Sequence, residues 1–266
     1  MKERLDVLLV QKGFFPTREK AKRAVMAGLV IVNEQKIEKA GTQIKIDEEP
    51  NIRIKGQIMP YASRGGLKLE KAIKEFGLKF EGKKVLDVGS STGGFTDCSL
   101  QHGAEYVYAV DVGTNQLDWK LRNDERVLSL ENMHIKNLTL EDLQENKVDY
   151  IVMDVSFISI TKVLEHLVKF MKPEAKIMAL IKPQFEVGRE NIEKGGIVKN
   201  LSKHKMAIEN VVANANKNGL HLERLDYSPI TGGKGNVEYI SLLSLEGGNN
   251  EINIDEIIEE GKTLKN

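Results

Sequence analysis

The sequence predicts an α/β fold with a mainly parallel sheet covered by helices on both faces, preceded by a small α+β module. Two observations predict the sheet. Strand-like apolar runs alternate with helical stretches between residues 85 and 244. The first run ends in a glycine-rich loop, which is typical of the carboxyl edge where such folds bind ligands. Residues 1–60 lack this alternation, so we expect them to fold as a separate unit.

The N-terminal module is predicted to contain two helices followed by short strands. Residues 4–10 carry apolar side chains at helical spacing, and Gly13 ends this helix. A second helix begins with a capping sequence at Thr17 and runs to Met26. Two strand-like runs follow, residues 29–32 and 43–46, and a turn at residues 33–35 lies between them.

The first 32 residues are basic, although the whole protein has a net charge of zero. They carry seven Lys or Arg side chains and three acids. A basic end on a neutral protein indicates a polyanionic partner. A solvated helix face would explain the same charges.

The main domain is predicted from the alternating pattern. Its strand-like runs are residues 85–88, 106–110, 127–130, 150–153, 175–181, 222–227 and 239–245. Its helical stretches are residues 95–101, 160–171 and 201–218. A glycine-rich turn separates the last two runs, which predicts an antiparallel hairpin at the end of the sheet.

These patterns divide the chain into four segments. Residues 1–60 form the module, residues 61–66 a linker and residues 67–245 the main domain. Residues 246–266 form an acidic tail with six acids and two lysines, in which residues 252–261 predict a short helix.

The composition excludes several classes of protein. No apolar run is long enough to span a bilayer, and the charged N-terminus is unlike a signal peptide. The single cysteine, Cys98, excludes an internal disulfide and suits a reducing cytoplasm, where we expect the protein. Five scattered histidines argue against a structural metal site, so we expect no metal and no membrane partner.

The glycine-rich loop, residues 84–96, favours a nucleoside ligand without phosphates. It lacks both the Gly-x-Gly-x-x-Gly spacing and the Gly-Lys-Ser/Thr sequence that hold phosphates. S-adenosylmethionine fits such a site. Asp111 closes the next strand and could accept both ribose hydroxyls, a position that nicotinamide enzymes also use. The predicted cofactor residues are Asp87, Gly89, Ser90, Ser91, Thr92, Gly93, Gly94, Phe95, Thr96, Asp111 and Asp154.

Two ionisable residues end strands at the same edge. Asp154 follows the fourth strand and Lys182 the fifth. A lysine after a buried strand needs an acidic neighbour, so these two could form a purely structural ion pair. Glu238 begins the last strand, and Lys68 lies on the helix that precedes the sheet.

The N-terminal module resembles the S4 RNA-binding fold, on the evidence of its basic second helix and the Gly28-Leu29-Val30 segment that follows. The main domain resembles the seven-stranded, Rossmann-like, S-adenosylmethionine-dependent methyltransferases of the FtsJ-like group. Together the two resemble the TlyA (hemolysin A-like) family. The segments that carry this resemblance are Arg64–Leu69, Asp87–Asp97 and Lys182–Glu186.

The resemblance implies 2′-O-methylation of cytidine in ribosomal RNA, 23S and in some members also 16S, with ribosomal RNA or subunits as partners. Lys68, Asp154, Lys182 and Glu238 match the Lys-Asp-Lys-Glu set of ribose 2′-O-methyltransferases. We assign Lys182 as the base and Asp154 as the group that orients it, with Lys68 and Glu238 positioning the ribose. The sequence leaves open which lysine is neutral, because coupled groups titrate as a set.

RNA contacts are expected from the basic module and from residues near the site. The predicted RNA-binding residues are Arg4, Arg18, Lys20, Lys22, Arg23, Arg64 and Arg189. Three alternatives remain: a membrane-active hemolysin, an RNA-binding protein with an inactive methyltransferase fold, and a nicotinamide oxidoreductase. The sequence leaves the oligomeric state open.

Overall fold

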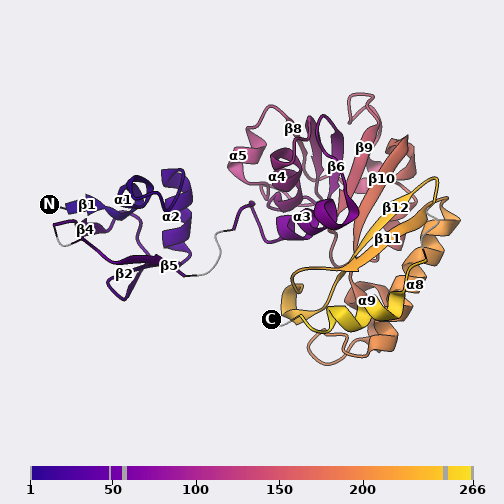
Figure 1. Cartoon of the computed structure of the whole chain (residues 1–266). Coiled ribbons are helices and arrows are strands. Elements are labelled where there is room, and N and C mark those ends of the chain that lie inside the picture. Colours follow the sequence, from indigo (N-terminus) through magenta and orange to yellow (C-terminus); the bar gives the residue numbers. More distant parts are fainter. Residues whose placement is uncertain (1, 48, 56–58, 248–250, 265–266) are drawn as a thin grey trace. The chain divides into compact units, whose positions relative to one another are not determined.

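The computed structural model describes residues 2–47, 49–55, 59–247 and 251–264. The chain divides into two compact units, Met1–Pro60 and Tyr61–Asn266 (Figure 1). We describe each unit by itself.

The N-terminal unit has two helices and two small sheets. Its elements are β1 (Lys2–Arg4), α1 (Leu5–Gln11), α2 (Arg18–Met26), β2 (Val30–Val32), β3 (Gln35–Ile37), β4 (Gln43–Lys45) and β5 (Ile52–Ile54). β2 pairs with β3 and β5, and β1 pairs with β4, all antiparallel. The two helices pack on a core that includes Leu5, Leu9, Phe15, Val25 and Val30. The side chain of Thr17 caps α2, as the sequence predicts, by accepting a hydrogen bond from the Lys20 amide.

Three strands of this unit, β1, β3 and β5, are absent from the sequence prediction. β3 follows β2 after a two-residue turn in which Asn33 and Glu34 have φ of 50° and 63°. This left-handed conformation favours glycine, and it costs a residue such as Glu34 about 1–2 kcal/mol. The hairpin therefore forms without the sequence signal that normally marks one.

The second unit contains one seven-stranded sheet with helices on both faces, which confirms the predicted fold class. Its strands are β6 (Lys84–Val88), β7 (Tyr106–Val110), β8 (Val127–Leu130), β9 (Val148–Met153), β10 (Met171–Ile181), β11 (His221–Tyr227) and β12 (Tyr239–Ser244). Their order across the sheet is β11-β12-β10-β9-β6-β7-β8. β12 runs antiparallel to both of its neighbours, and the predicted hairpin of the last two strands is present.

The α-helices of this unit are α3 (Gly65–Phe76), α4 (Gly94–Gln101), α5 (Trp119–Arg122), α6 (Thr161–Leu164), α7 (Pro183–Glu186), α8 (Leu201–Lys217) and α9 (Ile254–Gly261). Short 3₁₀-helices cover Ile135–Asn137, Val168–Phe170, Arg189–Asn191 and Gly233–Gly235. No helix within the described ranges is long and apolar enough to cross a membrane.

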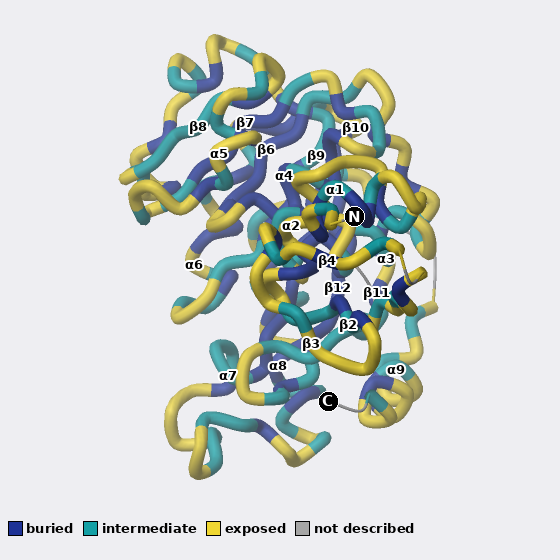
Figure 2. The backbone as a smooth tube through the Cα atoms, turned by 90° about the vertical axis from the view of Figure 1, so that its left-hand side faces the viewer, coloured by how far each residue is buried: buried dark blue, intermediate teal, exposed yellow. Residues whose placement is uncertain are grey.

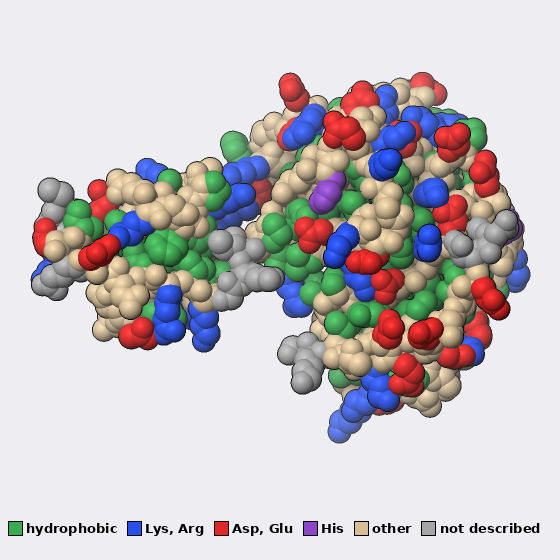
Figure 3. Space-filling view, in the orientation of Figure 1, with side chains coloured by type: hydrophobic (Ala, Val, Ile, Leu, Met, Phe, Trp, Pro, Cys, Tyr) green, Lys and Arg blue, Asp and Glu red, His purple; other side chains and the backbone are tan. Residues whose placement is uncertain are grey.

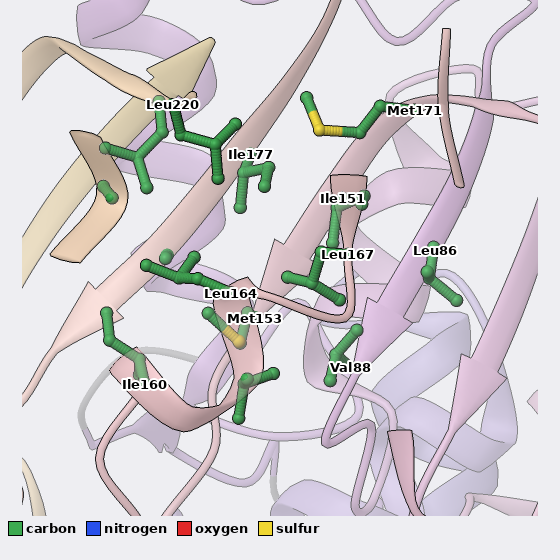
Figure 4. Close-up of a cluster of buried hydrophobic side chains, with 14 of the residues drawn as sticks. Leu86, Val88, Ile151, Met153, Ile160, Leu164, Leu167, Met171, Ile177 and Leu220 are labelled. Carbon is green, nitrogen blue, oxygen red and sulfur yellow. The ribbon is translucent and has the colours of Figure 1, made fainter. Parts of the chain in front are cut away.

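Side chains that alternate along the strands build a core on each face of the sheet. From β6, Leu86 and Val88 join the cluster under α6, α8 and α9 (Figure 4). Val85, one residue before Leu86, points to the other face and joins the cluster under α3 and α4. The central strands are accordingly buried (Figure 2). Because Asp87 also alternates with Leu86, it lies on the face covered by α3 and α4.

Two predicted segments differ from the structure. Residues 160–171 form α6 and a 3₁₀-turn instead of one helix, because the backbone bonds tighten to i→i−3 at His166, Leu167 and Phe170. Residues 61–66, expected as a linker, include the buried Tyr61 and the start of α3. The short helix predicted in the acidic tail is present as α9, which packs against α8 and β11 and buries Ile258.

Candidate active site

The carboxyl ends of three neighbouring parallel strands meet at one edge of the sheet. β6 ends before Gly89, β9 before Asp154 and β10 before Lys182. The Asp154 amide donates a hydrogen bond to the carbonyl of Val88, 3.3 Å away, which joins two of these ends. α3 brings Lys68 to this edge. The reversed direction of β12 places Glu238, just before its first residue, at the same edge.

The four ionisable residues form a continuous chain of charges. Lys68 Nζ donates to Glu238 Oε2 at 2.7 Å and to Asp154 Oδ2 at 3.2 Å. Lys182 Nζ lies 2.5 Å from Asp154 Oδ1 and donates to Ser156 Oγ at 2.8 Å. The structure therefore brings all four residues together, with Lys68 between two carboxylates and Asp154 between two amines.

This chain of charges is shielded from solvent. Lys68, Lys182 and Glu238 are at most 7% exposed. Burial lowers the pKa of Lys68, but the carboxylates of Asp154 and Glu238 outweigh it, so the pKa is raised. Burial likewise raises the pKa of Asp154, but the ammonium groups of Lys68 and Lys182 outweigh it and the pKa is lowered. Lys68 and Asp154 are therefore held in their charged forms.

A cavity of about 540 Å³ opens beside the four residues. The glycine-rich loop lines it with Asp87, Gly89, Ser90, Ser91, Gly94 and Phe95. Asp87 is fully buried, and its Oδ2 accepts a hydrogen bond from Thr96 Oγ1 at 2.6 Å. Its Oδ1 has no hydrogen-bond partner among the described residues. Burial, opposed by the Thr96 hydrogen bond, raises the pKa of Asp87 to about 7. The unpartnered Asp87 Oδ1 is suited to a ligand that carries a hydrogen-bond donor or a positive charge.

A second cavity, of about 380 Å³, adjoins the first. Gly89, Ser91, Asp154, Ser156 and Phe157 line both. Asp111 lies in the second cavity, where its carboxylate accepts hydrogen bonds from the amides of Ser91 and Gly113 at 2.8 and 2.7 Å. Each carboxylate oxygen keeps a further lone pair, so hydroxyl groups could still bind there. The two cavities together suit an elongated ligand with a nucleoside at one end.

Three predicted cofactor residues lie outside these walls. Thr92 is exposed on the loop. Gly93 has φ of 94° and packs so closely on Leu117 and Leu121 that a Cβ would lie 2.3 Å from the Leu121 side chain. Thr96 is buried and supports Asp87. Thr96 and Gly93 therefore shape the loop from behind the cavity.

The structure adds site residues that the sequence analysis does not predict as such. Ser156, Gln184, Lys234 and Asn236 line the first cavity. The sequence signal for the last two is the glycine-rich segment directly before Glu238. Phe157 is 92% exposed, with φ of 66°. Its ring centroid lies 5.4 Å from that of Phe185, and both rings line the first cavity.

The predicted RNA-binding residues fall into two groups. Arg4 and Arg18 both donate to the buried carboxylate of Asp6 at 3.0 Å, and the Arg4 hydrogen bond contributes most to lowering the pKa of Asp6 to about 2. These two arginines therefore also stabilise the fold. The other five, Lys20, Lys22, Arg23, Arg64 and Arg189, are exposed, as Arg4 and Arg18 also are. Of these, Arg64 lines the first cavity. Figure 3 shows Lys and Arg side chains on the visible face of the N-terminal unit, mixed with acids.

Comparison with known families identifies the fold that carries this site. The family model described as FtsJ-like methyltransferase matches residues 61–245, well over half of the chain. The chain belongs to the FtsJ-like methyltransferase family. The S4 domain model matches residues 3–49, so both resemblances expected from the sequence are confirmed.

Several relatives match this FtsJ-like protein over most of its length. The "Putative rRNA methyltransferase YqxC" of Bacillus subtilis is 47% identical over 99% of this chain and 96% of its own length. The "16S/23S rRNA (cytidine-2'-O)-methyltransferase TlyA" of Mycobacterium tuberculosis is 38% identical over 90% of this chain and 89% of its own. A solved structure, "Putative hemolysin from Streptococcus thermophilus", is 45% identical with a TM-score of 0.76, covering 98% of this chain and 96% of its own. In the part of this chain that the structure describes, no group of three or more His, Cys, Asp or Glu residues is placed to hold a metal ion.

Proposed function

We propose that this protein is a cytoplasmic, S-adenosylmethionine-dependent 2′-O-methyltransferase of cytidine in ribosomal RNA, with 23S RNA as its substrate and 16S RNA as the open alternative. The observation that carries the proposal is the buried Glu238–Lys68–Asp154–Lys182 chain, which faces a cavity next to a nucleoside-sized one. The relatives named as rRNA methyltransferases support the choice of substrate.

The residues present fit S-adenosylmethionine. The unpartnered, buried Asp87 Oδ1 suits the ammonium of the methionine part, and Asp111 suits the ribose hydroxyls. Gly89 and Ser91 lie between them, in the walls of both cavities. When bound, this cofactor supplies a methyl group on a positively charged sulfonium. Such a donor needs no phosphate-binding loop, which agrees with the glycine spacing.

Lys182 is the group that takes the proton from the ribose 2′-hydroxyl. Lys68 is a poor candidate, because two carboxylates raise its pKa and losing its proton would leave both without that partner. If Lys182 loses its proton, Asp154 still has Lys68 as a counterion. Asp154 and Ser156 hold the Lys182 amine in place from two sides. A base positioned in this way contributes about 10²–10⁴-fold to the rate.

The RNA is held by residues other than the four ionisable residues Glu238, Lys68, Asp154 and Lys182. Phe157 offers an exposed aromatic face at the cavity on which the base of the target nucleotide could stack. Arg64 in the cavity wall and Arg189 on the adjacent loop suit the flanking phosphates, and the S4 unit provides sequence-independent affinity.

Methyl transfer tests the proposal directly. The purified protein, given S-adenosylmethionine labelled in the methyl group, should label isolated ribosomal subunits, and digestion should place the label on a cytidine ribose. Mapping rRNA from cells with and without the protein would identify the nucleotide. No labelling of either subunit or of free rRNA would contradict the proposal, whereas label on a base would contradict the assigned 2′-hydroxyl.

The contribution of α2 can be measured separately. Lys20→Ala with Lys22→Ala should weaken RNA binding severalfold and make its logarithmic salt dependence shallower by about 1 to 2, because two exposed phosphate contacts are lost. S-adenosylmethionine affinity should stay the same. Lys74→Ala with Lys217→Ala, two exposed lysines of the other unit, changes the net charge equally and serves as the control. Equal losses in the two double variants would show that α2 has no specific role.

A further inference from the structure

Two glycine-containing loops form one wall of the first cavity. We call residues 192–198 the Gly196 loop and residues 230–236 the Gly232 loop. The Gly196 loop contributes Ile192 and Gly196 to the wall, and the Gly232 loop contributes six residues, among them Lys234 and Asn236. Neither loop is among the described residues that line the second cavity. The two loops therefore face the four catalytic residues and leave the predicted nucleoside end of the cofactor untouched.

Asn236 fastens these two loops together. Its side chain is 2% exposed and uses both ends of its amide. Oδ1 accepts a hydrogen bond from the Val198 amide at 3.0 Å, and Nδ2 donates to the Gly196 carbonyl at 2.9 Å. Its backbone carbonyl accepts from the Gly232 amide at 2.8 Å, which closes its own loop. One buried side chain thus fixes the backbone on both sides of the wall.

His204 forms a second connection to Val198. Burial lowers the pKa of His204, which keeps its ring neutral. Because a carbonyl can only accept, Nε2–H donates to the Val198 carbonyl at 2.7 Å, and Nδ1 accepts from the Tyr239 hydroxyl at 2.7 Å. Val198 is therefore held through its amide by Asn236 and through its carbonyl by His204. Asn236 lies two residues before Glu238 and Tyr239 directly after it. Both sets of hydrogen bonds therefore end close to this catalytic residue.

The Gly232 loop also limits where the Glu238 carboxylate can lie. A Cβ added to Gly232 would be 2.0 Å from Glu238 Oε1, so the bare backbone packs against this carboxylate. The other oxygen, Oε2, accepts the hydrogen bond from Lys68. The adjacent Gly233 has open space around an added Cβ. Gly232 therefore makes this close approach, and its neighbour Gly233 does not.

We propose that Asn236 is a positioning residue that joins the two loops into the subsite for the acceptor nucleotide and sets the position of Glu238 through the Gly232 backbone. This inference rests on the proposed function, because the wall adjoins the residues assigned to the ribose. The chemistry offered to the nucleotide is backbone amide and carbonyl groups together with the Lys234 cation. Such a wall can recognise the edges and phosphate of a nucleotide that has left its helix.

The test is to separate RNA recognition from cofactor binding in the full-length protein. Asn236→Ala should raise KM for ribosomal subunits about tenfold, since two buried hydrogen bonds are lost, with a smaller fall in kcat. The Kd for S-adenosylmethionine, measured by calorimetry, should change less than twofold. Asn218→Ala, which removes a partly buried amide at the end of α8, is the control and should leave KM unchanged. An unchanged KM for Asn236→Ala, or an equal loss of cofactor affinity, would overturn the proposal.

A second pair of variants tests the wall if Asn236→Ala does not fold. Gly232→Ala should lower kcat at least tenfold because its methyl group displaces Glu238, whereas Asn218→Ala, outside both loops, should again behave like the unsubstituted protein. Equal activity of the two alanine variants would contradict the inference and leave the proposed function intact. Absence of methyl transfer by the unsubstituted protein would overturn both.

Discussion

Lys182→Met is expected to lower kcat for ribose methylation by about 10²–10⁴-fold, because it removes the assigned base while keeping an apolar side chain of similar length. The fold should tolerate the change. Asp154, which pairs with Lys182, keeps Lys68 as a hydrogen-bonded counterion and is not left as a lone buried charge. The Kd for S-adenosylmethionine should stay within about twofold, since the residues assigned to hold it are unchanged. Single-turnover methylation of ribosomal subunits and calorimetry with the cofactor measure the two quantities.

Lys182→Arg distinguishes a base from a structural cation. A guanidinium keeps the positive charge next to Asp154 but does not release its proton at ordinary pH, so this variant should be as inactive as Lys182→Met. If Lys182→Arg restored most of the activity, Lys182 would serve as a counterion and the base would lie elsewhere. Loss of the folded state in both variants would support the structural ion pair that the sequence leaves open.

Asp87→Asn is expected to raise the Kd for S-adenosylmethionine about 10–100-fold at pH 8, the range for losing a hydrogen bond to a charged group. The wild-type affinity should depend on pH. The pKa of Asp87 is about 7 in the free protein because the carboxyl is buried. A cationic ligand favours the carboxylate, so affinity should reach a plateau above pH 7 and fall, by up to about tenfold per unit, as the pH drops below 7.

Asp87 should also make the free energy of unfolding depend on pH, in the direction opposite to that of cofactor affinity. Its pKa in the folded free protein is raised above the ordinary value of 3.8 for an aspartate. Its protonated form is therefore favoured by folding, and this contribution is lost as the pH rises from about 4 to 7. Asp87→Asn should flatten both the binding and the stability profiles in this window, measured by calorimetry and thermal unfolding. Glu141→Gln, at an exposed acid in a turn, is the control. A steep binding profile that persists in Asp87→Asn would show that another group titrates.

The sheet could be predicted from sequence because its strands are buried on both faces. Runs such as Met178–Ile181 are apolar at every position, and residues after such runs must lie at the carboxyl edge. This reasoning places Asp154 and Lys182 together without further knowledge. Lys68 lies in a helix, and Glu238 lies before a reversed strand. No local pattern therefore assigns these two residues to that edge of the sheet, and only the family resemblance does.

The remaining site features depend on contacts between loops distant in sequence. Asn236 meets Val198 across 38 residues, and His204 meets Tyr239 across 35. Neither pairing leaves a periodic pattern. The β2–β3 hairpin could not be predicted for a local reason, because Glu34 in its turn takes a left-handed conformation that normally favours glycine. The exposure of Phe157 could not be predicted either, because an aromatic residue just after a buried strand would ordinarily join the core.

The contact between Lys68 and Glu238 spans 170 residues. The carboxylate that completes the site therefore enters the molecule with its last strand. During synthesis, a growing chain that has already formed β6, β9 and β10 has Lys68 and Asp154 but lacks Glu238 and the Gly232 loop. Long-range pairings of this kind form late, after the intervening chain has folded. We therefore expect an unfinished copy of this protein, still attached to the ribosome that makes it, to gain methyltransferase activity only when β12 closes the sheet.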